Sequence, residues 1–449
     1  MVSRVSEDTA PPVAAGAESF AVSTAYRRYV VGLLLAVGVF NFIDRQIFSV
    51  LLESIKRDLA LSDTELGLLG GLAFSIFYVS VGIPIAWLAD RFNRRNIMAM
   101  AITTWSGMTA LCGLATGFGT LFIARVGVGV GEAGSGPPSQ SLIADYIPPK
   151  QRGGAMAILG LNLPLGILLG FLFGGWIGQY FGWRAAFYVV GIPGILLAIL
   201  VRLTLREPPR GHAEQLKSDG PTPPIFASLK YFLSRPTFRH LPLGAALYTL
   251  AAWGQLTWLP AFFIRVHGMS GGEAGTWLAF IIGIGGAISV IVGGFLSDRM
   301  ARRTGDDRWY PWISGLSVVV SLPFAFVIFL SASPYPALGC LIVTTLLSQT
   351  WIGPVNAMIQ GVAGVRRRAL ASAMFYFLIN LVSYGIGPLI IGAASDLFTP
   401  LYGAESLRYS LLVLTLVFQA WSAVHFFLAA RSVREDLAVA RSAAGAESL

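Results

Sequence analysis

A ten-residue pattern occurs twice, once in each half of the chain, and it constrains the fold more than any other feature. Residues 86–95 read AWLADRFNRR, and residues 294–303 read GFLSDRMARR. In both copies an apolar run ends in Asp-Arg and then an Arg pair, as is typical where a helix leaves lipid into a basic loop. Many secondary transporters are built by repeating a whole helical bundle. The sequence therefore predicts two related, membrane-embedded halves.

Composition supports a membrane protein. The 449 residues are 55% hydrophobic and only 12% charged, with a mean hydropathy of +0.68, which leaves too few charges to cover a water-soluble surface. Apolar runs of roughly 20 residues, the length that crosses a bilayer, recur along the chain. We predict an all-α integral membrane protein with about twelve transmembrane helices in two pseudo-symmetric six-helix bundles. The predicted span centres are near Val37, Ile76, Met108, Gly129, Leu168, Gly194, Leu250, Ile284, Val319, Thr345, Leu381 and Leu414.

The polar breaks divide the chain into five predicted parts. Residues 1–24 are small-residue-rich and lack the features of a cleaved signal peptide, so we predict a disordered cytoplasmic tail. Residues 25–206 form the N-terminal bundle and residues 237–432 the C-terminal bundle. Between them, residues 207–236 are rich in Pro and polar residues and form a cytoplasmic linker, part of which could be a surface helix. Residues 433–449 form a second cytoplasmic tail.

The distribution of basic residues predicts the topology. Most of the 32 Lys and Arg residues fall in the tails and the even-numbered breaks, so by the positive-inside rule both termini are cytoplasmic. The net charge of +9 is not gathered on one water-facing surface, which argues against nucleic-acid binding. Arg greatly outnumbers Lys and no N-glycosylation sequon occurs, so we expect a bacterial inner membrane protein. The exceptions to the charge pattern are Lys56, Arg57, Arg184, Arg265 and Arg408 in the odd-numbered breaks.

Four ionisable residues lie inside predicted spans, where a charge is costly and usually faces a cavity or a partner. The first span contains Asp44 and Arg45, and the fourth contains Arg125 and Glu132. Arg125 and Glu132 are two helical turns apart and so share one face. The side chains of Asp44 and Arg45 project about 100° apart around the helix, so they cannot both point directly at one partner.

Two interpretations of these four charges stay open. They could form a buried ion-pair cluster that only sets helix register, although desolvation makes such clusters a poor source of stability. We favour a switch, because moving an Arg toward or away from a buried carboxylate changes its affinity for a proton. Asp44 is then the primary proton carrier, Glu132 a second titrating group, and Arg125 the charge that pairs with each in turn. Arg45 is a further partner or a head-group contact.

The second half carries polar and aromatic candidates for the wall of a substrate cavity, and no charge inside its spans. Tyr376, Asn380 and Tyr384 recur every four residues and are expected on one helix face, unless they are an ordinary packing stripe. A cavity that is charged on one wall and apolar or aromatic on the other suits a molecule with an ionic head and an apolar body. The candidate cavity residues are Asn41, Tyr248, Gln255, Trp258, Gln349, Asn356, Tyr376, Asn380 and Tyr384.

Glycines of the fifth predicted span repeat every four residues, at positions 166, 170, 174 and 178. Such a stripe of small residues lets two helix backbones approach closely. We predict that this stripe is a packing surface.

The repeated motif resembles the loop between the second and third helices of the major facilitator superfamily, Gly-x-x-x-Asp-Arg-x-Gly-Arg-Arg. The matching positions of the first copy are Asp90, Arg91, Arg94 and Arg95, with Ala86 and Asn93 in place of glycines. The matching positions of the second copy are Gly294, Asp298, Arg299, Arg302 and Arg303, with Ala301 in place of a glycine. The resemblance implies the major facilitator fold.

The same resemblance implies a conformational latch that holds the halves together in the outward-open state. Asp90 and Arg91 would be its gate residues, with Asp145 and Arg152 as neighbours. Arg94, Arg95, Asp298 and Arg299 complete the set of gate candidates. The physical basis of such a latch is that the helix dipole stabilises a negative side chain at a helix N-terminus.

A closer likeness is to the Spinster-type branch, the sphingolipid and lysolipid transporters with their bacterial relatives. It rests on residues 41–45 (NFIDR), 125–133 (RVGVGVGEA) and 206–211 (REPPRG). The resemblance implies proton-coupled alternating access, with Asp44 and Glu132 as the coupling groups.

We therefore expect a transporter, not an enzyme, with the proton as coupling ion and no other cofactor or metal. The expected substrate is an amphipathic lipid, such as a lysolipid or a sphingoid phosphate. The alternatives are a small organic anion or drug as substrate, since Arg45 and Arg125 could hold a carboxylate as well as a phosphate, and a membrane sensor that does not transport. Substrate and membrane lipids are the expected partners, and we expect a monomer that binds no nucleic acid.

Overall fold

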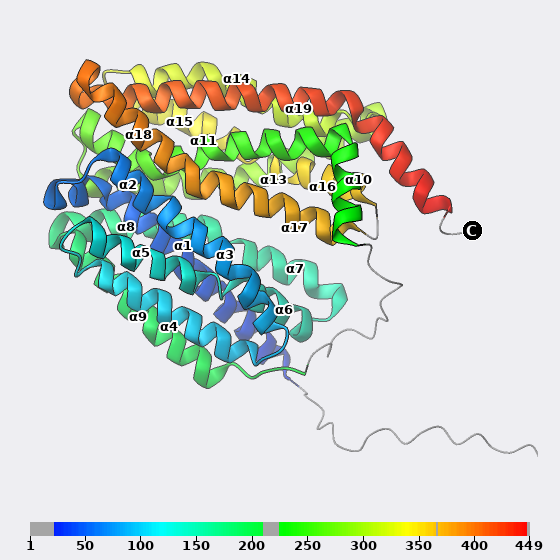
Figure 1. Ribbon diagram of the computed structural model, residues 1–449, viewed down its shortest axis with the longest axis horizontal. Helices are drawn as coiled ribbons and strands as arrows, with labels where there is room; N and C mark the ends of the chain where they lie inside the picture. Colours follow the sequence, from blue (N-terminus) through cyan, green and yellow to red (C-terminus); the bar gives the residue numbers. More distant parts are fainter. Residues whose placement is uncertain (1–21, 210–223, 365–366, 447–449) are drawn as a thin grey trace, which may run out of the picture.

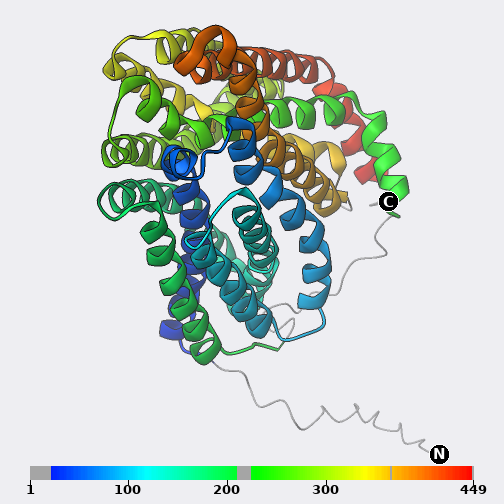
Figure 2. The same cartoon turned by 60° about the vertical axis from the view of Figure 1, so that its left-hand side comes forward.

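The computed structural model describes residues 22–209, 224–364 and 367–446. Most of these residues are helical, and no β-strand occurs among them. Two bundles lie against each other, one made by the first half of the chain and one by the second (Figures 1 and 2). The predicted all-α architecture of two bundles is confirmed. Residues 1–21 of the predicted N-terminal tail and residues 210–223 of the predicted linker lie outside the described residues.

The first bundle contains nine helices, several of which are halves of one interrupted span. For example, α2 and α3 are separated only by Gly71, and α7 and α8 only by Leu161. The bounds are α1 (Thr24–Leu59), α2 (Asp63–Gly70), α3 (Leu72–Ala89), α4 (Arg94–Cys112), α5 (Phe118–Glu132), α6 (Gly136–Tyr146), α7 (Pro149–Gly160), α8 (Asn162–Phe181) and α9 (Trp183–Thr204).

The second bundle follows a short helix, α10 (Ile225–Ser234), and contains two π-helical turns, η1 and η3. Its elements are α11 (Pro236–His267), α12 (Gly271–Leu278), η1 (Ala279–Ile284), α13 (Gly285–Thr304), α14 (Trp309–Leu330), α15 (Pro334–Ser348), α16 (Ile352–Ala363), α17 (Arg368–Ile379), η3 (Asn380–Tyr384), α18 (Gly385–Tyr402), the 3₁₀ turn η4 (Gly403–Glu405) and α19 (Ser406–Ala446).

The helices have the length and the exposed apolar side chains that are expected in a lipid bilayer. Eight segments of the described chain are long and apolar enough to cross a membrane, and each of the twelve predicted span centres falls inside a helix. Large apolar side chains such as Leu203, Ile291 and Leu401 are more than 70% exposed, as expected where the solvent is hydrocarbon. The predicted linker and C-terminal tail contain helix as well, because α10 and the end of α19 lie within them.

The glycine stripe of α8 packs against α1, as predicted. A Cβ built on Gly170 would lie 2.7 Å from the Cβ of Gln46, and one on Gly174 would lie 2.7 Å from Val50 Cγ1. Only glycine permits this approach, so the stripe brings α8 directly onto the helix that bears Asp44 and Arg45.

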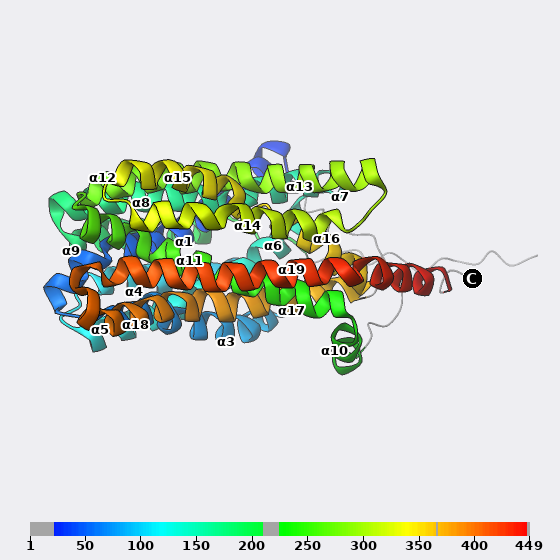
Figure 3. The ribbon, with the colours of Figure 1, turned by 90° about the horizontal axis from the view of Figure 1, so that it is seen from above.

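The two ends of the molecule differ in how the bundles meet. We call the end at which α1 begins and α19 ends the tail side, and the other end the opposite side (Figures 1 and 3). Toward the opposite side one hydrophobic core joins both bundles, including Phe48 and Phe171 with Trp258 and Phe262. Toward the tail side each bundle has a core of its own. The bundles are therefore joined at the opposite side and separate at the tail side.

Candidate functional site

The centre of the molecule holds a buried ion pair between α1 and α5. The Arg45 Nε donates to Glu132 Oε2 at 2.7 Å, and the Arg45 and Glu132 side chains are 9% and 0% exposed. Removing one member of such a pair would leave an uncompensated charge in a low-dielectric interior. The pair therefore ties α1 to α5 as long as both groups are charged.

Asp44, the neighbour of Arg45 in α1, is also buried and is only 1% exposed. Neither of its carboxylate oxygens has a hydrogen-bond partner among the described residues, and the same is true of Glu132 Oε1. Arg125, Thr109 and Glu132 are the charged and polar neighbours of Asp44. An ionised carboxylate without hydrogen bonds is costly to bury, so this position favours a group that can accept a proton.

Aromatic rings surround the Arg45 guanidinium. Its central carbon lies 4.6 Å from the centroid of Phe74, 4.9 Å from Tyr78 and 5.2 Å from both Phe42 and Tyr384. Cation–π contacts of this kind stabilise a desolvated guanidinium. Since Tyr384 belongs to the second bundle, Arg45 lies where the two bundles meet.

A cavity of about 240 Å³ opens beside this pair, on the tail side of Arg45. Arg45 is the charged residue among its lining side chains, and both bundles contribute to the wall. The lining is partly aliphatic, with Leu34, Val37 and Leu159, partly aromatic, with Phe42, Tyr78 and Tyr384, and partly polar, with Asn41, Ser135, Ser139, Gln140, Asn162 and Asn380.

A second cavity, of about 30 Å³, lies on the other side of Arg45 and has room for about one water molecule. Both Arg45 and Arg125 line it, together with Ser49, Thr257 and Tyr384. Arg125 Nη1 has no hydrogen-bond partner within the described part of the chain. The two buried arginines therefore face one shared space between the bundles.

The nine predicted cavity residues separate into two groups. Asn41, Asn380 and Tyr384 line the larger cavity. Among the others, Gln255 donates to Thr415 and Trp258 to the Pro388 carbonyl, both at 2.9 Å within the second bundle. Tyr248 packs against Trp351, Tyr376 donates to Asn356 at 3.0 Å, and the Gln349 backbone N–H donates to Ser289.

A π-helical turn explains why the predicted stripe of Tyr376, Asn380 and Tyr384 does not act as one face. The wider turn η3 begins at Asn380 and ends at Tyr384, and it changes the helical register relative to α17. As a result Asn380 and Tyr384 line the cavity, while the Tyr376 side chain pairs with Asn356. π-Helical turns within α-helices are frequent at functional sites.

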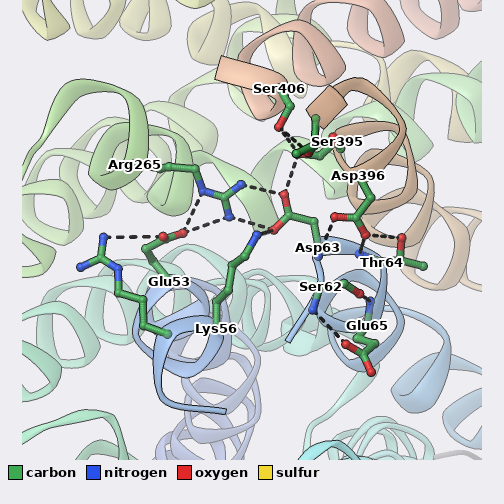
Figure 4. A network of polar contacts seen from close by, with 12 residues as sticks. Glu53, Lys56, Ser62, Asp63, Thr64, Glu65, Arg265, Ser395, Asp396 and Ser406 are labelled. Carbon is green, nitrogen blue, oxygen red and sulfur yellow. Dashed lines mark hydrogen bonds and ion pairs between the residues drawn. The ribbon is translucent and has the colours of Figure 1, made fainter. Parts of the chain in front are cut away.

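A polar network on the opposite side joins the two bundles (Figure 4). Arg265, near the end of α11, donates to Asp63 at 2.6 and 2.8 Å and to Glu53 at 3.0 Å. Asp63 also accepts from Lys56 at 2.5 Å and from Ser395 at 2.6 Å. Asp63 is 1% exposed, so the network is a desolvated connection between the bundles.

Asp396 of α18 completes this network by capping a helix of the other bundle. Its carboxylate accepts from the backbone N–H groups of Asp63 at 3.1 Å and Thr64 at 2.7 Å, and from the Thr64 hydroxyl at 2.6 Å. These are free N–H groups in the first turn of α2, whose own cap, Ser62, serves Glu65. A carboxylate is also favoured there by the helix dipole.

The sequence did not predict this network. The sequence nevertheless contains a sign of the network, because Lys56, Arg57 and Arg265 are exceptions to the positive-inside pattern. Basic residues on the less basic side of a membrane protein indicate that acidic partners lie nearby. Here those partners are Glu53 and Asp63.

The predicted latch residues lie on the tail side, where the bundles are separate. Asp90 is exposed and forms no ion pair with any described residue, while the Arg91 guanidinium lies 3.7 Å from the Trp87 ring centroid. In the second copy, Asp298 accepts from Tyr310 and pairs with Arg302, and Arg299 is exposed. Between described residues, no ion pair joins the two bundles on this side.

Arg94 of the first motif has a structural role that the sequence did not predict. It is 1% exposed, forms ion pairs with Asp145 and with Glu207, and also donates to Ser141 and the Pro208 carbonyl. The Arg95 backbone N–H donates to Glu207 as well. Asp145 is thus joined to Arg94 here, while Arg152 donates to the Ala144 carbonyl.

Comparisons with known proteins agree on one family. The model of the Major Facilitator Superfamily matches residues 34–388. An MFS-type efflux pump of Mycolicibacterium smegmatis is 34% identical over 410 residues, which are 91% of this chain and 93% of that protein. The probable galactarate/D-glucarate transporter GudP of Bacillus subtilis is 31% identical over 327 residues, 67% of this chain and 71% of that protein.

One solved structure is similar over nearly its whole length. It is a bacterial homologue of the human lysosomal transporter Spinster, in an inward-facing and unoccupied conformation. The TM-score is 0.84 at 32% identity, and the match covers 92% of this chain and 99% of that chain.

Proposed function

Because the chain belongs to the major facilitator superfamily, we propose that it uses protons to move an anionic, amphipathic lipid across the membrane by alternating access. Members of this family are transporters, so the chain is a multi-pass membrane transporter. The observation that carries the finer proposal is the buried Arg45–Glu132 pair. It stands beside a carboxylate without hydrogen bonds, Asp44, at the edge of a cavity that both bundles line.

Alternating access is supported by the difference between the two ends. One core and one ion-pair network close the opposite side, while each bundle has its own core on the tail side. We place the tail side in the cytoplasm because the basic loops lie there. The conformation is then inward-facing, and the network around Arg265 has to open before the cavity can face the other way.

Proton coupling follows from the balance of charges at the centre. A proton that reaches the Glu132 carboxylate from the cavity neutralises it, and the Arg45 guanidinium loses its ionic partner. Arg45 then pairs with an anionic substrate in the cavity that it lines. When Glu132 releases the proton, the pair with Arg45 forms again and displaces the anion. Asp44, whose carboxylate oxygens have no hydrogen-bond partner among the described residues, is another site for the proton, with Arg125 as the nearby cation.

The lining of the larger cavity supports an amphipathic anion. One cation, Arg45, stands at its inner end, with aliphatic and aromatic side chains along the wall. A head group held by Arg45 leaves an acyl chain against Leu34, Val37 and Leu159. The lipid class is also what the resemblance of the sequence to the Spinster-type branch implies, and the chain is 32% identical to a bacterial homologue of Spinster.

A small organic anion is the second candidate. The relative named as a galactarate/D-glucarate transporter is 31% identical to this chain, and the amides of Asn41, Gln140, Asn162 and Asn380 could bind hydroxyl groups. In this case Arg45 would bind a carboxylate of the substrate, and the aliphatic wall of the cavity would contribute little to substrate binding.

Transport by the purified protein in liposomes separates these functions. A labelled lysophospholipid and labelled galactarate are supplied with and without an imposed pH gradient. We expect gradient-dependent movement of the lysophospholipid, with Asp44→Asn and Glu132→Gln abolishing the dependence on the gradient. Glu435→Gln, which removes an exposed carboxylate of α19, is the matched control and leaves transport unchanged.

Each alternative has its own outcome. Gradient-driven movement of galactarate alone would favour the second candidate. Lysophospholipid movement that is equally fast without a gradient, in the wild type and in both variants, would refute proton coupling.

A further inference from the structure

Helix α10 lies across the membrane-spanning helices, unlike its neighbours. Figure 1 shows it running perpendicular to α11 and α17 at the tail side, and Figure 3 shows it nearly end-on at the edge of the bundle. Its inner face is fixed to the second bundle. Phe232 is fully buried and stacks on Phe238 at 4.3 Å between ring centroids, and Tyr231 donates to the Val362 carbonyl at 3.1 Å.

The outer face of α10 carries large apolar side chains that are uncovered, with the exposed Lys230 between them. Phe226 is 85% exposed and Leu233, two turns further along, is 56% exposed. A short helix at the end of a span, with one face packed and large apolar side chains on the other, is typical of a helix that lies in the membrane interface.

Basic side chains gather beside this face. The guanidinium carbons of Arg235 and Arg367 lie 4.9 and 4.6 Å from the centroid of the same ring, that of Tyr231. The Nε of each is buried and has no hydrogen-bond partner among the residues that the structure describes. Asp436, the acid nearest to Arg235, is 4.0 Å away and accepts the Thr237 N–H.

Three further cations, Lys230, Arg239 and Arg368, are exposed around the same helix. Positive charge therefore exceeds negative charge here.

We propose that α10 and these cations form a binding surface for anionic phospholipids of the tail-side leaflet. The phosphate of one lipid is held between Arg235 and Arg367 beside Tyr231, and Phe226 and Leu233 enter the acyl-chain boundary. The phosphate oxygens accept from the Nη groups of the two guanidiniums, whose side chains are partly exposed. A membrane fits better than a soluble polyanion because exposed apolar side chains adjoin the cations at the level where the spans end.

This surface is separate from the central cavity, so the inference does not depend on the transported substrate. Because α10 is packed on the first turns of α11 and on α16, lipid bound there holds the tail-side end of the second bundle at the membrane surface.

The first test measures lipid retained by the full-length protein. The protein is purified with an equimolar mixture of phosphatidylglycerol and phosphatidylcholine, and the retained lipids are counted by native mass spectrometry. We expect preferential retention of phosphatidylglycerol, and about 30-fold weaker retention in the Arg235→Gln/Arg367→Gln double variant, from the loss of two charges at the surface. Retention of phosphatidylcholine stays the same.

The matched control removes two arginines from the projecting end of α19. Arg434→Gln/Arg441→Gln has the same change in charge, and both residues are exposed. Equal loss in both double variants, or none in the first, overturns the proposal. Displacement of phosphatidylglycerol by an equal concentration of inorganic phosphate identifies a site for free anions and also overturns it.

The second test does not depend on those arginines. A spin label is placed at Leu233→Cys in a Cys340→Ser background, since Cys112 is fully buried. In phosphatidylglycerol-containing vesicles we expect the label to collide more often with oxygen than with a water-soluble nickel complex, and the reverse for a label at Arg441→Cys. Preferential collision with nickel at position 233 overturns the interfacial placement.

Discussion

Arg265 and Asp63 form a two-point ion pair across the boundary between the two bundles, at 2.6 and 2.8 Å. The pair is largely desolvated, with the Arg265 side chain 12% exposed and that of Asp63 1% exposed. The attraction in an ion pair of this kind offsets the cost of desolvating both charges, and removing one partner leaves that cost without compensation. It therefore stabilises one conformation of the transporter, the one that is closed on the opposite side.

The first prediction concerns Arg265→Gln. Without the guanidinium, Asp63 keeps Lys56 and Glu53 keeps Arg57, but the two acids lose the cation between them. The state that buries them is therefore destabilised, by less than the roughly 3 to 5 kcal/mol that follows when a buried charge loses its only partner. We expect the population that is open on the opposite side to rise at least about tenfold. Distances between spin labels at Thr116 and Leu401, one on each bundle at that end, measure the shift.

The control for this variant is Arg408→Gln. Arg408 is also a partly buried arginine on the opposite side, at 16% exposure, but its partner Glu405 belongs to the same bundle. We expect its label distances to match those of the wild type. Equal distance distributions in the wild type and Arg265→Gln would show that the network does not set the conformation.

The second prediction concerns Asp396→Asn. The amide keeps one oxygen acceptor but loses the negative charge at the first turn of α2, where free N–H groups and the helix dipole favour an anion. We expect the same direction of shift as for Arg265→Gln but a smaller one, of about 1 kcal/mol. Thr64→Ala, which removes only the hydroxyl bond, should shift the label distances less than Asp396→Asn. A larger effect of Thr64→Ala would contradict the capping role.

The third prediction is a double-mutant cycle on the central pair. Arg45→Gln and Glu132→Gln each leave one buried charge unpaired, at a cost of about 3 to 5 kcal/mol in the free energy of unfolding. The double variant leaves neither charge unpaired, so we expect it to be more stable than the sum of the single changes indicates, by at least about 1 kcal/mol. Thermal unfolding in detergent gives the four stabilities. Additive losses would mean that the two groups do not interact.

The fourth prediction tests the contact between α1 and α8. In Gly170→Ala the new methyl group would lie 2.7 Å from the Gln46 Cβ and 3.1 Å from the Ile43 carbonyl oxygen. Overpacking of this kind costs about 1 to 3 kcal/mol, and it displaces the helix that holds Asp44 and Arg45. Both the unfolding temperature and proton-dependent transport should fall.

Gly160→Ala is the matched control for Gly170→Ala. A Cβ at Gly160, in the preceding helix α7, meets nothing within 4 Å. Because alanine favours a helix over glycine by up to about 1 kcal/mol, we expect the control to be unchanged or slightly more stable. If both substitutions had the same effect, close packing at position 170 would not be the cause.

Several features of the molecule could be predicted from the sequence. The repeated motif and the apolar runs predicted two helical bundles, and each predicted span centre lies in a helix. The cost of burying charge pointed to Asp44, Arg45, Arg125 and Glu132, and all four are buried at the centre. These predictions succeed because hydrophobic periodicity and the cost of an intramembrane charge are properties of a segment by itself.

The partners of the buried charges could not be predicted in this way. The sequence favoured Arg125 as the alternating partner of both acids, and in this conformation Glu132 pairs with Arg45. The π-helical turn η3 likewise decides which of Tyr376, Asn380 and Tyr384 reach the cavity. Both outcomes depend on how helices distant in the sequence pack and rotate.

By itself, then, the sequence determined the bundles, the basic side of the membrane protein and the buried charges, because each follows from local composition and spacing. Only the tertiary structure decided that Arg265 and Asp396 close one end against Asp63 and Thr64, and that α10 lies across the spans. Those contacts join residues hundreds of positions apart, and their geometry exists only once the two bundles have packed together in one of their conformations.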